Sequence, residues 1–120
     1  MGAMDDVFES VADYMKLLAV PTRLKVLHSI CDGEKSVGEI VGECALTQTN
    51  VSRQLRTLYA AGVLSRRQER NLVYYQLSDP TLLELCHVVC GRIAVRIDAR
   101  KPLKKSLLKF MGTHRRGASS

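Results

Sequence analysis

The sequence contains no run of roughly 18 or more apolar residues, the length that a helix needs to cross a bilayer. Its N-terminus also lacks a basic stretch followed by an apolar segment, which is the pattern of a secretory signal. We therefore expect a cytoplasmic protein with no membrane partner. No Ser/His/Asp set, glycine-rich phosphate loop or pair of carboxylates has a spacing typical of catalysis, so an enzyme is not expected.

Cysteine is scarce, and the chain holds only Cys31, Cys44, Cys86 and Cys90. Because no secretory signal is found, a framework of structural disulfides is not expected. The thiols should be reduced and available for metal binding or redox chemistry.

The size and composition are those of a single globular domain. The chain has 120 residues, of which 46% are hydrophobic and 25% are charged. Its net charge of +6 is unevenly distributed. Residues 1–46 hold four basic and eight acidic side chains, residues 47–77 hold five Arg and one Glu, and residues 96–120 hold eight basic and one acidic side chain. The excess in 47–77 indicates a phosphate-binding surface, whereas solvated charge is the simpler interpretation of the tail alone.

Apolar spacing and end signals predict five helices. A capping box of Ser36 and Glu39 opens the third helix, and Thr47 is the expected N-cap of the fourth, with Gly62 placed to end it. Asp79 and Pro80 should open the fifth as its N-cap and first helical residue. The predicted ranges are 5–18, 21–31, 36–44, 47–61 and 80–96.

Two short β-strands are predicted at residues 63–67 and 71–77, with residues 68–70 as the tip between them. A short helix, a tight turn and a longer polar helix form a helix-turn-helix, and the hairpin adds a wing. The expected fold is a winged helix-turn-helix, mainly α with a small two-stranded β-hairpin. We assign residues 5–98 to this domain, and residues 99–120 to a basic tail that is either a short amphipathic helix or frayed.

The fourth predicted helix carries the side chains expected to contact double-stranded DNA. Its apolar stripe is Val51, Leu55 and Leu58, and its opposite side is polar and cationic. Asn and Gln can bond adenine, Arg can bond guanine, and Ser or Thr can bond phosphate. The alternative is a solvated helix face, but hairpin arginines flanking the same groove weigh against it. The predicted DNA-binding residues are Thr47, Gln48, Thr49, Asn50, Ser52, Arg53, Gln54 and Arg56 of the helix, with Arg66, Arg67 and Arg70 of the hairpin.

The first and last helices of the domain predict a homodimer. Both are apolar on more than one side, and a domain of this size cannot cover both. A single DNA-binding domain also contacts few base pairs, whereas a two-fold dimer doubles the contact and matches a palindromic site.

These features resemble the ArsR/SmtB family of winged-helix repressors over residues 8–95. The resemblance rests on an ordered set of segments, residues 17–27, 33–40, 50–58, 61–64, 66–70 and 74–77. It implies a homodimer that binds operator DNA and is released when an inducer alters the dimer. It also implies that residues 47–61 are the recognition helix and residues 66–71 the wing.

Departures from the family pattern limit what the resemblance implies. Family recognition helices often have His at the position of Gln54 and a small residue at that of Asn50, so the operator sequence stays open. The Cys-Val-Cys of the metalloid sensors is replaced here by residues 36–38, Ser-Val-Gly. Of the zinc ligands of other members, only Asp79 corresponds. The inducer is therefore not carried over from either pattern.

Cys86 and Cys90 lie one helical turn apart on one face of the last predicted helix. Such a pair can hold a soft metal or metalloid ion, with Cys31 or Cys44 of the same or the partner chain as a third ligand. Thiolates also serve oxidant and sulfide sensing. The alternative is that these cysteines are small buried hydrophobes.

The leading interpretation is an inducible homodimeric repressor that binds a palindromic operator. One alternative is a thiol-based metal-binding or redox protein without a sequence-specific DNA role. Another treats the basic tail as an anchor to membrane surfaces or to nonspecific nucleic acid.

Overall fold

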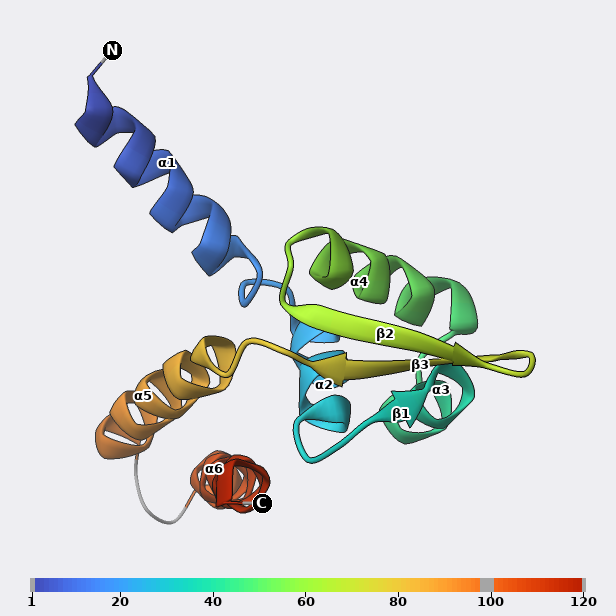
Figure 1. The fold of residues 1–120 in the computed structure, drawn as a ribbon. Coiled ribbons are helices and arrows are strands. Elements are labelled where there is room, and N and C mark those ends of the chain that lie inside the picture. Colours follow the sequence, from blue (N-terminus) through green and yellow to red (C-terminus); the bar gives the residue numbers. More distant parts are fainter. Residues whose placement is uncertain (1, 98–100, 120) are drawn as a thin grey trace.

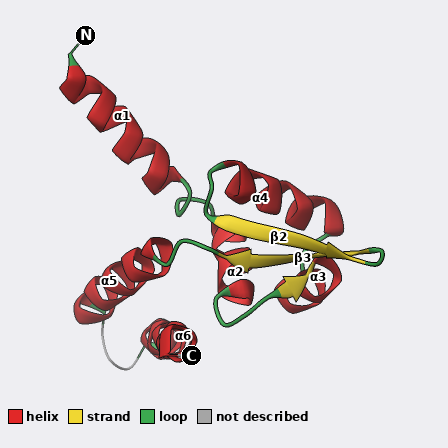
Figure 2. Ribbon diagram, in the orientation of Figure 1, coloured by secondary structure: helices red, strands yellow, loops and turns green. Residues whose placement is uncertain are grey.

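The structure is a computed structural model that describes residues 2–97 and 101–119, with side chains up to residue 112. This part of the chain forms six helices and a three-stranded antiparallel sheet (Figure 1, Figure 2). The predicted winged helix-turn-helix is confirmed. The elements are α1 (Ala3–Lys16), α2 (Pro21–Ile30), β1 (Lys35–Ser36), α3 (Val37–Cys44), α4 (Gln48–Ala60), β2 (Leu64–Glu69), β3 (Leu72–Leu77), α5 (Thr81–Arg96) and α6 (Pro102–Ser119).

The ends of α3 and α4 are fixed by the predicted local signals. The Glu39 amide donates to the Ser36 hydroxyl at 3.2 Å, and the Ser36 amide donates to the Glu39 carboxylate at 3.0 Å, which completes a capping box. The Asn50 amide donates to the Thr47 hydroxyl at 3.1 Å, so Thr47 caps α4. Gly62 follows α4 with φ +81°, a conformation that glycine adopts without steric cost.

The sheet has one more strand than predicted. β1 pairs with β3, with Lys35 opposite Tyr75 and Ser36 opposite Tyr74, which makes the strand order β1-β3-β2. Two residues are too few to show strand alternation, so this strand depends on the partner that β3 offers. β3 is therefore the central strand of the sheet.

β2 and β3 form the predicted hairpin, but its tip is shorter than predicted. Leu64 pairs with Leu77 at the base and Glu69 pairs with Leu72 at the far end. The turn is therefore Arg70 and Asn71 rather than residues 68–70. Arg70 has φ +57°, which suits a two-residue hairpin loop.

The core lies where α2, α3 and α4 pack on one another and on the sheet. The predicted stripe of α4 is confirmed, because Val51, Leu55 and Leu58 are all fully buried. This packing fixes which side of α4 faces outward. Other fully buried side chains are Val26, Leu27, Ile30, Ile40, Val63 and Leu82.

Helix α5 begins one residue later than predicted, with Pro80 as its N-cap residue. The Asp79 carboxylate accepts hydrogen bonds from the Tyr14 hydroxyl at 2.7 Å and from the Thr81 amide at 3.0 Å. These two bonds lower the pKa of Asp79. Burial, together with the bond to Asp79, raises the pKa of Tyr14 to about 12. The contact ties the end of α1 to the start of α5.

Helix α1 projects from the rest of the molecule, and none of its residues is buried (Figure 1). Helix α6 instead packs beside α5. His87 Nε2 lies 2.9 Å from the Met111 carbonyl oxygen, and the Phe110 ring stacks on His28 of α2 with centroids 4.7 Å apart. The segment predicted to be a short helix or a frayed tail is therefore a docked helix. The predicted boundary at residues 98 and 99 lies outside the described residues.

Candidate nucleic-acid interface

The outer side of α4 presents uncovered polar and cationic side chains. Gln48, Thr49, Arg53 and Arg56 are exposed. Within the part of the chain that the structure describes, neither of these arginines pairs with a carboxylate. Their charge is therefore available to an anionic partner. Three further predicted contacts lie at this surface, the exposed Thr47 and the half-buried Asn50 and Ser52.

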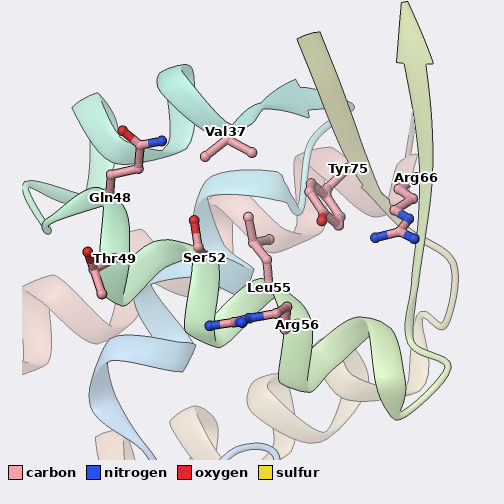
Figure 3. A pocket seen from close by; sticks show the side chains of 8 residues that line it. All are labelled: Val37, Gln48, Thr49, Ser52, Leu55, Arg56, Arg66 and Tyr75. Carbon is pink, nitrogen blue, oxygen red and sulfur yellow. The ribbon is translucent and has the colours of Figure 1, made fainter. Parts of the chain in front are cut away.

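A groove of about 580 Å³ runs between α4 and the wing. Figure 3 shows Thr49, Ser52 and Arg56 projecting from α4 on one side and Arg66 and Tyr75 from the strands on the other. The groove also lies at the first residues of α3 and α4, where helix dipoles favour an anion. The full lining is Val37, Gln48, Thr49, Ser52, Leu55, Arg56, Arg66 and Tyr75.

Gln54 does not belong to this surface, so the prediction that it is exposed was wrong. Its side chain is only 6% exposed. Its Oε1 accepts a hydrogen bond from Arg23 Nε at 3.1 Å, and its Nε2 donates to Thr22 Oγ1 at 3.2 Å and to Asn50 Oδ1 at 3.1 Å. Gln54 therefore holds α4 against α2 and has no free edge for a base.

The neighbouring wing arginines Arg66 and Arg67 have different surroundings. The Arg66 guanidinium lies over the Tyr59 ring, 4.2 Å from its centroid, and the phenols of Tyr75 and Tyr59 raise its pKa. Among the described residues it pairs with no carboxylate. The Arg67 guanidinium pairs instead with Glu34 and Glu69, which raise its pKa. Only Arg66 of these two keeps its charge uncompensated.

The third predicted wing contact, Arg70, is exposed at the hairpin turn. Like Arg66, it forms no ion pair with any described residue. Its position at the outer end of the wing is the one that the sequence predicted.

Four residues that shape this surface were missed by the sequence analysis: Arg23, Glu34, Tyr59 and Tyr75. The partners of Arg23 and Glu34 lie 31 and 33 residues away along the chain, so no local pattern connects them. Tyr75 carried only a strand signal, and Tyr59 follows the buried stripe of α4 by one residue. No sequence signal marked the placement of Arg66 between these two phenols.

Cys31 and Cys44 are buried donors to carbonyls of α2. Cys31 Sγ lies 3.0 Å from the His28 oxygen, and Cys44 Sγ lies 3.4 Å from the Lys25 oxygen. Burial raises the pKa of Cys31 to about 11 and also raises that of Cys44. Both thiols are therefore neutral at pH 7 and serve the packing of α2 against its neighbours.

Cys86 is buried and Cys90 half-buried on α5. Burial and the nearby Cys90 thiol raise the pKa of Cys86 to about 11, and burial raises the pKa of Cys90. Within the described part of one chain, no group of three His, Cys, Asp or Glu side chains is arranged to hold a metal ion. A three-sulfur site completed by Cys31 or Cys44 of the same chain therefore does not fit this structure.

Helices α1 and α5 each expose several large apolar side chains that a protein of this size normally covers. On α1, Phe8 is 62% exposed, and on α5, Val95 is 75% exposed. The remaining exposed apolar residues of these helices are Met4, Val7, Val11, Met15, Val88, Val89 and Ile93. No helix in the described residues combines the length and the hydropathy of a membrane span.

Residues 20–66 match the family model described as a bacterial regulatory protein of the arsR family. This range runs from the start of α2 into β2, so it includes α3 and α4 and the base of the wing.

Rv0081 of Mycobacterium tuberculosis, an uncharacterized HTH-type transcriptional regulator, is 30% identical over 105 residues, which cover 80% of this chain and 92% of that protein. Its crystal structure has a TM-score of 0.66 at 31% identity, covering 73% and 89% of the two chains. A biofilm growth-associated repressor of Agrobacterium fabrum is 35% identical over 79 residues, which cover 66% of this chain and 68% of that protein.

The solution structure of a homodimeric winged helix-turn-helix DNA-binding domain, Mb0332 of Mycobacterium bovis, shares the fold with a TM-score of 0.67. It is 24% identical and covers 84% of this chain and 96% of that one. These matches agree with the fold. The chain belongs to the ArsR/SmtB family of winged helix-turn-helix transcriptional repressors, which are DNA-binding regulators and not enzymes.

Proposed function

We propose that two copies of this chain bind a palindromic operator by placing the outer side of α4 in successive major grooves. The observation that carries the proposal concerns Arg53 and Arg56, whose guanidinium groups form no ion pair with any described residue. Both lie on the exposed side of α4, opposite its buried stripe. An uncompensated cationic helix beside a groove lined by hydroxyl groups suits a duplex that offers acceptors on bases and phosphates.

The side chains of α4 have different tasks in this proposal. Arg53 and Arg56 reach guanine edges or phosphates, and Gln48 reaches adenine. Thr49 and Ser52 donate to phosphate from the first turns of α4, where backbone amides add to the attraction. Thr47 caps α4 and orients its first turn. The amide oxygen of Asn50 already accepts a bond from Gln54, so Asn50 acts mainly by its remaining donors.

The second copy covers the exposed apolar sides of α1 and α5. The charged or polar residues between the apolar ones, such as Arg92 and Arg96, are exposed as well, which is the pattern of an interface rim. Mb0332, which shares this fold, is a homodimer. A two-fold dimer built on these helices would set the spacing of the two α4 helices.

The inducer, in this proposal, acts at Cys86 and Cys90. These thiols lie on α5, and the exposed apolar side of α5 is the part that contacts the second copy in this proposal. A change in the distance between the two sulfur atoms would therefore alter the dimer interface directly. Both are protonated at pH 7, and a soft ion that binds thiolates must displace protons from a buried position. Two thiolates bound to one divalent ion form a neutral site, but the bonds draw the two sulfur atoms together, and the resulting shift of α5 is the proposed route to operator release.

The test is selection of bound sequences from a random DNA pool, followed by light scattering of the complex with the selected duplex. We expect a palindrome with one half-site for each recognition helix, bound by two protomers, with affinity that falls steeply with salt. A pool without enrichment, or one protomer on an asymmetric site, would contradict the proposal. Tight binding of a soft ion in the absence of any DNA preference would favour the thiol-protein alternative.

A further inference from the structure

We propose that the two adjacent wing arginines have separate roles: Arg67 is a positioning residue that clamps the sheet, and Arg66 is the phosphate contact of the wing. This proposal rests on the proposed function, because it concerns how the wing meets DNA. From the sequence alone, both arginines were predicted to contact DNA.

The Arg67 clamp joins β2 and β3 to the residue that precedes β1. Arg67 stands on β2 opposite Tyr74 of β3, and its guanidinium lies over the Tyr74 ring, 4.6 Å from the centroid. Beyond that ring it reaches Glu34, the residue before β1, with Nε at 2.9 and 3.0 Å from the two carboxylate oxygens and Nη2 at 2.8 Å from one of them. The side chain therefore connects the outer strand of the wing to the opposite edge of the sheet.

The carboxylate contacts of Arg67 engage all three nitrogens of its guanidinium group. Its remaining terminal nitrogen, Nη1, donates to the Glu69 carboxylate at 2.8 Å. Two carboxylates around one guanidinium leave a net negative charge at this point, which repels a phosphate. A two-pronged Arg–carboxylate contact also fixes the orientation of both groups, which an isolated surface ion pair does not. A phosphate that approached Arg67 would have to overcome this negative charge.

Arg66 has the opposite arrangement. It points into the groove between α4 and the wing, where Figure 3 shows its guanidinium on the same opening as the Arg56 guanidinium. Its partners are the aromatic ring of Tyr59 at the end of α4 and the phenol of Tyr75 on β3, which hold the cation without neutralising it. Arg66 is thus held in place in the free protein and still carries a full charge for a phosphate.

The geometry also explains why clamping matters for Arg66. Tyr74, beneath Arg67, and Tyr75, beside Arg66, are consecutive residues of β3. The β2–β3 hairpin pairs along six residues, but β1 pairs with β3 at only two. Loosening the Arg67–Glu34 contact therefore lets the hairpin move relative to the β1 edge, and Arg66 moves with the hairpin. Loss of the clamp should therefore weaken DNA binding indirectly, through the position of the wing, without removing a phosphate contact.

The experiment compares the affinity of the selected operator at several salt concentrations for the wild type, Arg66→Ala, Arg67→Ala, Glu34→Gln and the Arg67→Ala/Glu34→Gln double variant. For a dimer, Arg66→Ala should reduce the slope of log affinity against log salt by about two, because each copy loses one phosphate contact. Arg67→Ala and Glu34→Gln should each weaken binding several-fold with the slope unchanged. The double variant should bind no more weakly than either single variant, because both remove the same clamp.

Two results would overturn the proposal. Tighter binding with a steeper slope for Glu34→Gln would show that Arg67 contacts DNA and that Glu34 competes with the phosphate. An unchanged slope for Arg66→Ala would remove Arg66 as the contact.

A readout without DNA separates this proposal from the proposed function. Amide hydrogen exchange of residues 64–77 should be faster in Glu34→Gln and Arg67→Ala than in the wild type, and unchanged in Arg66→Ala. The wild type could show this exchange pattern and yet no preference for any operator sequence. That result would contradict the proposed function but support the structural role of the Arg67–Glu34 contact. If exchange were equal in all variants, the clamp would be wrong whatever the DNA data showed.

Discussion

Arg23 Nε donates a hydrogen bond to Gln54 Oε1 at 3.1 Å, and this contact joins α2 to the buried side of the recognition helix. The same guanidinium donates from Nη1 to the Lys16 carbonyl at the end of α1, at 3.0 Å. The orientation of α4 is therefore fixed by a polar network as well as by its apolar stripe, and that network reaches the helix that we assign to the dimer interface.

Replacing Gln54 should destabilise the fold. In Gln54→Leu, Arg23 and Thr22 lose buried partners that water does not readily replace, at a cost of about 1–3 kcal/mol in the free energy of unfolding. The measurement is urea unfolding followed by circular dichroism. Gln48→Leu, on the exposed side of the same helix, is the control and should change stability by less than about 0.5 kcal/mol. Equal stabilities for the two variants would contradict the role given to the network.

A charge placed in the exposed apolar surface of α1 or α5 should separate the dimer. Phe8→Asp and Val95→Asp would each put a carboxylate into an interface that excludes water, once per copy. Light scattering should then give the mass of one chain, with operator affinity strongly reduced. Leu108→Asp, at a position that is also exposed but lies on α6, should remain dimeric. A wild-type protein that is monomeric at micromolar concentration would contradict the assignment before any variant is made.

The sensor proposal predicts that Cys86→Ser and Cys90→Ser bind the operator as the wild type does but resist release. The readout is fluorescence anisotropy of the labelled operator complex during titration with mercuric chloride, with cadmium chloride, and with diamide as an oxidant. Cys44→Ser is the control, because its thiol donates to a backbone carbonyl elsewhere in the core. Full release in the Cys86→Ser/Cys90→Ser double variant would reject these residues as the sensor.

Because the pKa values of the Cys86 and Cys90 thiols are raised, release of the operator by a soft ion should become easier as pH rises. Because burial holds Cys86 protonated up to a pKa of about 11, a soft ion must displace a proton throughout the neutral range. Apparent affinity for the ion should therefore increase as pH rises from about 6 to about 9. For the free protein, the unfolded chain loses this proton at lower pH than the folded chain, so stability should fall above the ordinary thiol pKa.

Docking of α6 should depend on the stack between Phe110 and His28. Phe110→Ala removes one ring and should lower the free energy of unfolding by about 1–2 kcal/mol, whereas Leu108→Ala, an exposed neighbour, should have little effect. Burial lowers the pKa of His28, so its pKa measured by NMR should rise in Phe110→Ala as water reaches the ring. An unchanged His28 titration would mean that α6 does not cover it.

The parts of the fold that the sequence predicted well are those with local causes. The Ser36–Glu39 capping box, the Thr47 cap and the glycine after α4 each act within a few residues, so the pattern determines the structure. β1 was missed because its existence depends on pairing with Tyr74 and Tyr75, far along the chain. The docking of α6 likewise depends on α2 and α5 and has no local signal.

Within the candidate site, the wrong prediction for Gln54 gave more weight to its polar side chain than to its position along the helix. Gln54 stands three residues after Val51 and four before Leu58, which is the spacing of the buried stripe. Its polar side chain suggested exposure, but partners from α2 satisfy it inside. Arg66 and Arg67 are adjacent residues of the same type, so the sequence does not distinguish them. The order of the strands brings Glu34 next to Arg67 alone.

The most direct test of the account is the operator affinity of Arg53→Ala/Arg56→Ala, measured by fluorescence anisotropy beside Lys105→Ala, which removes an exposed charge from α6. We expect a loss of about tenfold or more for the first variant, with discrimination among operator sequences reduced, and little change for the second. Wild-type affinity and sequence preference in the Arg53→Ala/Arg56→Ala protein would show that the outer side of α4 does not read DNA.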